Sequence, residues 1–475
     1  MWPFSSRRST RPPAQIFLTN SLTGSKELFV PLKPGSVSMY SCGPTVYDRA
    51  SIGNLRSYVF SDTLARMFLA SGSHVRRVIN ITDVGHLVAD AEEGEDKMAL
   101  GAARERRSPA EIAERYARLF VEDLDALEVD TGAILFPRAT EYVAEQIAMA
   151  KTLEERGFAY RLPEGLYFDT SRFARYGVLG NVGHARLKAG ARVAPLAGKR
   201  HPSDFALWRF AKPGDLQQWP SPWGRGNPGW HIECSAMIRA LLGPTIDIHT
   251  GGEDHIAVHH NNEIAQSESA NDRPLARYWL HNAFLTVQGE KIAKSAGNVF
   301  YLSDLAARGY DPLALRYFFL QAHYRTPLSF SFEALDAAAE GLLRLRRLAA
   351  ALREESGGKA APSAARERLA LSVRDDLATP AALGILWESL KSEEYAPEEK
   401  WGLIEDADAF FGLALGRKAE EGPLPPEVAA LAERREAARA AKDFAAADRL
   451  RRELEARGYA VEDGAKGPIL TKRPR

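Results

Sequence analysis

Cysteine is scarce in this chain, which has only Cys42 and Cys234 among its 475 residues. Two cysteines cannot build the disulfide framework that stabilises small secreted domains. Sparse cysteine is typical of proteins in the reducing cytoplasm, and it favours a metal-binding or catalytic role for the thiols that are present. We therefore expect a cytoplasmic protein in which the two cysteines have a function.

The sequence also lacks long apolar runs and any excess of charge of one sign. It has neither an uninterrupted apolar segment of membrane-spanning length nor the apolar core of a signal peptide, so no membrane partner is expected. Its 62 Lys and Arg residues balance its 62 Asp and Glu residues. Bulk attraction to nucleic acid is therefore absent, and any contact with a nucleic acid must use a local basic patch.

The composition that remains is that of a globular protein, with 45% hydrophobic and 26% charged residues. The length indicates two to four domains. Residues 36–41 read as a buried strand, Gly53 opens a helix that stops at Ser71, and residues 75–81 follow as a second strand. A similar alternation returns over residues 245–287. This pattern predicts an α/β fold built on a doubly wound, Rossmann-like parallel sheet.

Ligands of such sheets bind at the carboxyl ends of the strands. Cys42, the loop at Ser51 and the Gly251-Gly252 loop all lie just past predicted strand ends. Gly53 follows a strand, where a glycine allows a phosphate to approach the backbone at a helix N-terminus. Taken alone, a glycine pair followed by an acid, as at Gly251, is more often a simple turn.

The later part of the chain is predicted to be helical. Residues 332–355 repeat Leu, Ala and Arg at amphipathic spacing, and linkers rich in Gly and Pro follow near 357–363 and 420–426. The last segment, 427–457, reads as one Ala/Arg/Glu-rich helix. It offers these basic side chains for phosphate contacts: Arg434, Arg435, Arg439, Lys442, Arg449, Arg451 and Arg452. Acidic residues interleave with them, so a solvated charged helix is the alternative.

Four side chains stand out as a candidate metal site. His259 and Glu263 are four residues apart, so on a helix they point from one face. Two thiolates, one imidazole and one carboxylate form a tetrahedral zinc set if the fold brings Cys42 to Cys234, His259 and Glu263. The alternative is that each cysteine is a small buried apolar residue and that the His/Glu pair lies on the surface.

Several long segments resemble cysteinyl-tRNA synthetase. They are, in chain order, Ser51-Ile52-Gly53-Asn54 (in the place of His-Ile-Gly-His), Gly229-Trp230-His231-Ile232-Glu233-Cys234-Ser235-Ala236-Met237, Asp247-Ile248-His249-Thr250-Gly251-Gly252-Glu253-Asp254, and Lys291-Ile292-Ala293-Lys294-Ser295 (in the place of Lys-Met-Ser-Lys-Ser). The resemblance runs through nearly the whole chain, with the segments in the family's order.

The resemblance implies a class I synthetase that activates L-cysteine with ATP and Mg²⁺ and transfers it to tRNA(Cys), as a monomer. It places one Zn²⁺ on Cys42, Cys234, His259 and Glu263, where a soft metal would select a thiol over the hydroxyl of serine. The other expected site residues are, for ATP, Gly53, Gly251, Gly252, Asp254 and Lys294; for catalysis, Lys291, Lys294, Ser51 and Asn54; and for the amino acid, Trp230 and Thr45.

The resemblance also implies a domain order. We expect an N-terminal extension and leading strands in 1–35, the halves of the catalytic domain in 36–140 and 229–310, a connective insertion in 141–228, a stem-contact and helical-bundle region in 311–420 and an anticodon-binding segment in 421–475. The C-terminal domains are expected to be all-α.

Three of the departures from the family pattern bear on catalysis. Ser51 and Asn54 replace the two histidines of His-Ile-Gly-His, and Ala293 replaces the serine of the lysine loop. Losing one transition-state donor costs on the order of 3 kcal/mol, or about a hundredfold in rate. We expect activity to persist because Lys294 and the metal set are present. The alternatives are a cysteine ligase of the mycothiol type, which uses an amino-sugar acceptor, and a non-catalytic cysteine- or tRNA-binding relative.

Overall fold

A parallel five-stranded sheet lies at the centre of the first two thirds of the chain. The computed structural model describes residues 14–86, 96–181, 198–287, 290–291, 298–417, 426–457, 459–464 and 467–472. The strand order is β11-β10-β3-β4-β5, and every neighbouring pair is parallel. The strands are β3 (Ser36–Ser41), β4 (His74–Ile79), β5 (Ile134–Leu135), β10 (Ile246–Gly252) and β11 (Ala276–Asn282).

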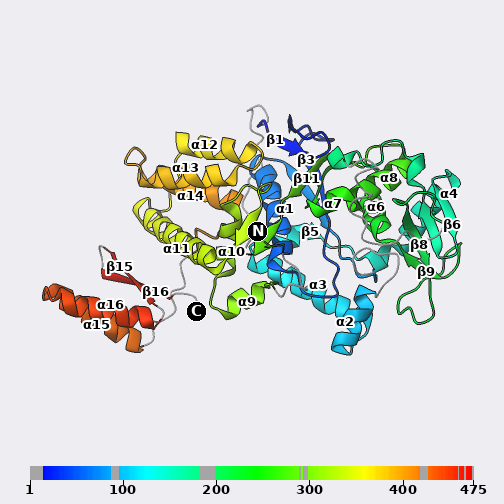
Figure 1. The fold of residues 1–475 in the computed structure, drawn as a ribbon. Coiled ribbons are helices and arrows are strands. Elements are labelled where there is room, and N and C mark those ends of the chain that lie inside the picture. Colours follow the sequence, from blue (N-terminus) through cyan, green and yellow to red (C-terminus); the bar gives the residue numbers. More distant parts are fainter. Residues whose placement is uncertain are drawn as a thin grey trace.

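Helices cover both faces of this sheet (Figure 1). The side chain of Met39 on β3 joins the core formed with α1 (Ile52–Ala70), whereas that of the next residue, Tyr40, joins the core formed with α6 (Trp230–Leu241) and α8 (His259–Asn271). Successive side chains of a strand point to opposite faces, so a strand buried on both sides is continuously apolar. The predicted doubly wound α/β fold is confirmed.

The strand order reverses beside β3. The chain leaves β3 through α1 to β4 on one side, whereas β10 pairs with the other side of β3 and places Thr250 opposite Ser41. Such a switch point leaves a crevice at the carboxyl ends of the strands. Cys42 follows β3 directly, and Gly251 and Gly252 end β10, so all three lie at this edge.

Smaller elements surround the central sheet. A hairpin precedes it, formed by β1 (Phe17–Asn20) and β2 (Ser25–Leu28). Between β4 and α6 the chain forms α2 (Lys97–Glu105), α3 (Pro109–Ala126), α4 (Val143–Glu155), β6 (Ala159–Leu162), β7 (Gly165–Phe168), β8 (Phe205–Phe210) and β9 (Gly226–Pro228). Strands β6 to β9 form an antiparallel sheet that packs on a second apolar core.

The part of the chain beyond the sheet is mainly helical. The short helix α7 (Asp254–Ala257) still belongs to the sheet region, between β10 and α8. Short elements lead into the helical part: β12 (Leu285–Val287), β13 (Glu290–Lys291), α9 (Leu302–Ala307), α10 (Pro312–Leu320) and β14 (Leu328–Phe330). A helical bundle follows: α11 (Phe332–Glu355), α12 (Ala364–Arg374), α13 (Thr379–Lys391) and α14 (Pro397–Phe411). Helix α11 has the bounds that its amphipathic spacing predicts. None of the described helices is long and apolar enough to cross a membrane.

The C-terminal segment differs from its prediction. The single helix expected over 427–457 is wrong, because α15 (Pro426–Ala440) ends before α16 (Phe444–Ala456) begins. Lys442 adopts a left-handed φ of 60°, and the side chain of Asp443 accepts a hydrogen bond from the Ala446 amide at 3.0 Å, which caps α16.

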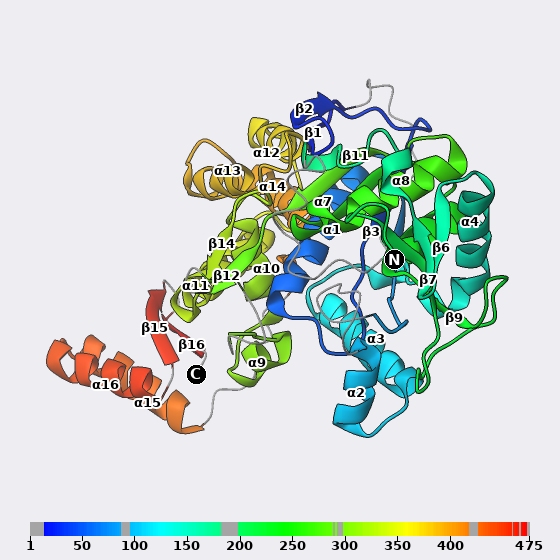
Figure 2. The same ribbon diagram turned by 45° about the vertical axis from the view of Figure 1, so that its right-hand side comes forward.

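A β-hairpin that the sequence analysis did not foresee follows the two helices. It is formed by β15 (Tyr459–Gly464) and β16 (Gly467–Lys472). Leu431, Leu450, Leu454 and Val461 contribute to a separate apolar core that joins the hairpin to the helices. This unit lies beside the helical bundle, away from the central sheet (Figure 2).

Candidate active site and metal centre

The fold brings the four residues of the proposed metal set into one buried cluster. Cys42 follows β3, Cys234 lies on α6, and His259 and Glu263 lie one turn apart on α8. One ligand atom from each lies within 4.8 Å of the others. The His259 Nε2 atom is 2.6 Å from Glu263 Oε1 and 3.8 Å from Cys234 Sγ, and Cys42 Sγ is 3.7 Å from the same carboxylate oxygen. Residues 192 positions apart in the chain, Cys42 and Cys234, thus meet at the edge of the sheet.

This arrangement fits a tetrahedral zinc ion. Zn–S bonds of about 2.3 Å and Zn–N or Zn–O bonds of about 2.0–2.2 Å place tetrahedral ligand atoms roughly 3.3–3.8 Å apart. The Cys42–Glu263 and Cys234–His259 distances of 3.7 and 3.8 Å agree with this spacing, whereas the 2.6 Å between His259 and Glu263 would have to lengthen. On its other side, His259 Nδ1 lies 2.9 Å from His231 Nδ1. A second partner of this kind fixes the orientation of a ligating imidazole.

The charges within the cluster also suit a cation. Burial alone would raise the pKa of Glu263, but His249 and His259 hold it below its ordinary value. Burial opposes protonation of His259, yet Glu263 and Cys234 raise its pKa to about 10. Burial raises the pKa of the Cys42 thiol, whereas a hydrogen bond from Cys42 lowers the pKa of Cys234. A zinc ion binds cysteine as the thiolate, so it would displace the thiol protons on binding.

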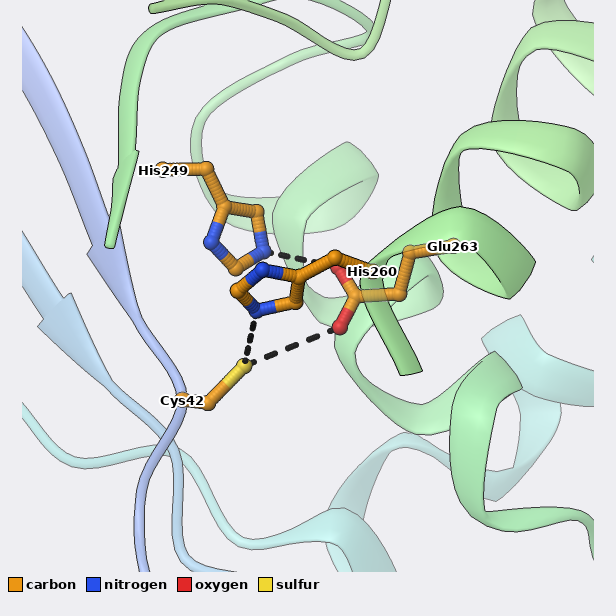
Figure 3. Close-up of side chains that lie close together, drawn as sticks. All are labelled: Cys42, His249, His260 and Glu263. Atoms are coloured by element: carbon orange, nitrogen blue, oxygen red, sulfur yellow. Dashed lines mark hydrogen bonds and ion pairs between the residues drawn. The ribbon is translucent and has the colours of Figure 1, made fainter. Parts of the chain in front are cut away.

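A second group of potential ligands shares two members with the first. Cys42, His249, His260 and Glu263 also have ligand atoms within 4.8 Å of one another (Figure 3). His249 Nε2 is 2.7 Å from Glu263 Oε2, and Cys42 Sγ is 3.2 Å from His260 Nε2. His249 and His260 were not among the expected site residues, although His249 lies in a segment that carries the resemblance and His260 follows His259 directly.

Trp230 lies at the Cys234 side of this cluster. Its ring stacks on His259, with centroids 4.2 Å apart and an interplanar angle of 26°. Trp230 is half-buried, so its indole can contact both the cluster and a bound molecule. Zinc on the first group would therefore be bordered by a partly exposed aromatic ring, whereas the Trp279 ring that stacks on His249 in the second group is buried.

Two glycines allow the strands to reach this site. A Cβ on Gly43 would lie 1.5 Å from the carbonyl oxygen of Asn80, so no larger residue fits after Cys42. A Cβ on Gly251 would lie 2.7 Å from both His255 Nδ1 and His260 Cε1. Glycine at these positions therefore permits close packing of backbone against backbone and of β10 against the histidines.

A cavity of about 350 Å³ lies at the same edge of the sheet. It brings together predicted site residues from three separate segments: Thr45, Ser51, Gly53, Asn54, Gly252 and Asp254. Trp230 is not among the described residues that line it. Further lining residues that the sequence analysis missed include Asp48, Arg49, Asn282 and Tyr301. Asn282 ends β11 and the other three lie outside helices and strands, and none of them is part of a sequence pattern.

Ser51 and Asn54 cap the first turn of α1 beside this cavity. The Ser51 hydroxyl accepts a hydrogen bond from the Asn54 amide at 3.3 Å and donates one to Asn54 Oδ1 at 2.7 Å. Asn54 Oδ1 in turn accepts from the Ser51 amide at 3.0 Å. This reciprocal pair is a capping box. Ser51 and Asn54, which replace the two histidines of the pattern, therefore form hydrogen bonds with each other.

The lysine loop cannot be placed in the same way. Lys294 and Ala293 lie outside the described residues, and for Lys291 the structure describes only the backbone, which ends β13. The proposed roles of Lys291 and Lys294 stay predictions.

Comparison with known proteins gives the family. The model of the class I (C) tRNA synthetase catalytic domain matches residues 28–340, and the model of the cysteinyl-tRNA ligase anticodon-binding domain matches residues 421–467. Cysteine–tRNA ligase 1 of Burkholderia lata is 49% identical over 447 residues, which cover 93% of this chain and 94% of the relative. The chain belongs to the cysteine–tRNA ligase family. The cysteine–tRNA ligase of Chlorobaculum tepidum is 42% identical over 486 residues, covering 97% of this chain and 99% of the relative.

Solved structures of other class I synthetases share the fold of this cysteine–tRNA ligase family member. The LeuRS of Agrobacterium radiobacter K84, in its complex with tRNA and LeuAMS, has a TM-score of 0.61 at 12% identity and covers 82% of this chain and 86% of its own. A methionyl-tRNA synthetase of Mycobacterium tuberculosis has a TM-score of 0.56 at 16% identity and covers 80% of this chain and 93% of its own. The predicted family and fold class are confirmed.

Proposed function

We propose that the protein activates L-cysteine with ATP and transfers it to the 3′ end of tRNA(Cys). One observation carries this proposal: a cavity lined by three of the proposed ATP-binding residues, Gly53, Gly252 and Asp254, opens at the same sheet edge as a buried Cys/Cys/His/Glu cluster. The first can hold a nucleotide and the second can hold a metal that recognises a thiol. Few other substrates would require the two sites together.

The cluster is proposed to hold one Zn²⁺ through Cys42, Cys234, His259 and Glu263. A zinc ion with an open position supplies a soft Lewis acid that binds the thiolate of cysteine far better than the hydroxyl of serine. His231 would orient His259 and His249 would orient Glu263, through the 2.9 and 2.7 Å contacts. Trp230 would cover the bound amino acid by packing beside His259.

ATP is proposed to occupy the cavity, with Mg²⁺ on its phosphates. The carboxylate of cysteine attacks the α-phosphate, the bond to the β-phosphate breaks, and cysteinyl-adenylate and pyrophosphate form. This step needs positioning and electrostatic stabilisation rather than a covalent enzyme intermediate. Gly53 and Gly252 would let the nucleotide approach the backbone closely. Asp254 would bind polar groups of the nucleotide. Lys291 and Lys294 would approach its phosphates.

The adenylate is then proposed to pass to the terminal ribose of tRNA(Cys). The match of residues 421–467 to an anticodon-binding domain supports a tRNA acceptor over a small amino sugar. Both cysteines are free, and each is needed as a thiolate, which supports a reducing cytoplasmic location. All four proposed ligands come from one chain, so the metal site needs no second subunit, and the monomer stays a prediction.

Metal analysis combined with aminoacylation tests this proposal. We expect the protein to charge tRNA(Cys) with cysteine and to contain one zinc ion per chain. Glu263→Gln should lose most of the zinc and the charging activity. Glu268→Gln is the matched control, because Glu268 lies on the same helix but pairs with Arg175 at 3.1 Å. Full zinc content and full charging by Glu263→Gln would contradict the proposed ligand set.

A further inference from the structure

The described residues that line the proposed nucleotide cavity include more acidic than basic side chains. Asp48 and Asp254 bring carboxylates to its wall, and Arg49 is the one Arg, Lys or His among the described residues that line it. A triphosphate carries several negative charges, so two aspartates would repel it unless cations lie nearby. Among the described residues of the cavity wall, Arg49 is therefore the one that can neutralise a phosphate.

The Arg49 side chain is held in a defined orientation. Its Nε donates to Asp123 Oδ2 at 3.0 Å, and its Nη2 donates to Asp123 Oδ1 at 2.5 Å. Asp123 lies on α3 and is 2% exposed, whereas the Arg49 side chain is 24% exposed. This pairing uses one edge of the guanidinium. The N–H bonds of Nη1 point away from Asp123 and stay available to a second partner.

Ser51 cannot donate a hydrogen bond to a phosphate while it caps α1. A hydroxyl has a single hydrogen to donate, and that of Ser51 goes to Asn54 Oδ1 at 2.7 Å. Serine also carries no charge. The positive charge at this end of the cavity wall must therefore come from another residue, and Arg49 is two positions away.

We infer that Arg49 contacts the phosphates of ATP and supplies positive charge during cysteine activation, with Asp123 as the residue that positions it. This inference rests on the proposed function, in which ATP occupies the cavity. The opposing interpretation is that the Arg49–Asp123 pair only fastens the loop after Cys42 to α3.

Variants of Arg49 separate these interpretations by two measurements, Mg-ATP binding by calorimetry and cysteine-dependent ATP–pyrophosphate exchange. Arg49→Gln should lower the exchange rate roughly a hundredfold, the usual effect of removing one transition-state donor, and should weaken ATP binding. Arg49→Lys should recover part of the loss, because it keeps the charge but not the two-pronged geometry. Asp123→Asn should lose less activity than Arg49→Gln, since the cation remains. A purely structural pair predicts equal losses from both.

Arg118→Gln is the matched control, because it removes an arginine of α3 whose exposed side chain pairs with Glu122 at 3.2 Å outside the cavity. It should bind ATP and exchange pyrophosphate like the unchanged protein. Ser51→His in the Arg49→Gln background should restore part of the exchange by bringing a second donor to the wall. ATP binding and exchange within twofold of the unchanged protein in folded Arg49→Gln would overturn the inference. If the unchanged protein binds ATP without exchange, the proposed activation fails, and the binding data alone decide the role of Arg49.

Discussion

Neutralising Asp62 should destabilise the connection between the central sheet and the helical bundle. Asp62 lies on α1 and is 1% exposed. It accepts hydrogen bonds from Arg66 Nε at 2.6 Å, Arg77 Nη1 at 2.9 Å and Arg316 Nη2 at 2.6 Å. Arg316 is fully buried on α10 and also donates to the carbonyl oxygen of Phe411, at the end of α14. One carboxylate therefore holds together three arginines from separate elements.

The size of the effect follows from this geometry. Burial alone would raise the pKa of Asp62, but Arg66, Arg316 and Arg77 hold it well below its ordinary value. Burial lowers the pKa of Arg316 to about 10, so its guanidinium is still charged at neutral pH. Asp62→Asn keeps the shape of the side chain but leaves three buried cations facing a neutral amide. Breaking a buried ion pair in this way costs about 3–5 kcal/mol.

Thermal unfolding at several pH values is the assay. At roughly 2 °C per kcal/mol for a large domain, Asp62→Asn should lower Tm by about 6 °C or more at pH 7. The folded pKa of Asp62 is depressed, so its charge stabilises the fold above an unfolded pKa of about 4 and the contribution is lost as the pH falls below that value. The difference in Tm between the two proteins should therefore shrink in acid.

Glu122→Gln is the control, because Glu122 forms an exposed pair with Arg118, which contributes at most about 1 kcal/mol. A Tm for Asp62→Asn within 2 °C of the unchanged protein, or a difference that grows in acid, would refute the reasoning.

Three further predictions concern the site itself. Gly43→Ala should disturb Cys42 and lower both zinc content and stability, because its Cβ would lie 1.5 Å from the Asn80 carbonyl oxygen; unchanged zinc content and Tm would contradict this. Ser51→Ala should cost about 1 kcal/mol of stability through the lost cap with Asn54, while exchange stays within about threefold; a hundredfold loss of exchange in the folded variant would show that the hydroxyl acts in catalysis instead. Stripping zinc with a chelator should stop cysteine-dependent exchange and adding zinc back should restore it; full exchange by the metal-free protein would exclude the proposed role of the metal.

Much of the fold is encoded in short segments of sequence. The strand pattern of residues 36–41, the helix that follows it and the amphipathic spacing of α11 are local features, and each forms the element that its pattern predicts. The break before Asp443 depends on one residue with a left-handed φ inside an Ala-rich segment without glycine or proline, so the pattern there favours a continuous helix.

For the same reason, some residues of the site can be predicted from the sequence and others cannot. Cys42 and Cys234 stand out because cysteine is rare, and the spacing of His259 and Glu263 is visible on a helix. The pairing of Arg49 with Asp123 is not visible, because the sequence has 62 basic and 62 acidic residues and only the fold selects which ones meet. The contact of His249 with Glu263 likewise depends on β10 lying beside α8. Such contacts depend on long-range packing, which the periodicity of the sequence does not reveal.

The most direct test of the proposed activity is cysteine-dependent ATP–pyrophosphate exchange on protein whose zinc content has been measured, with serine as the control amino acid. The proposed chemistry predicts exchange with cysteine and little or none with serine, because only a thiolate binds the zinc tightly. The absence of exchange from folded, zinc-loaded protein would contradict the proposal that this chain activates cysteine.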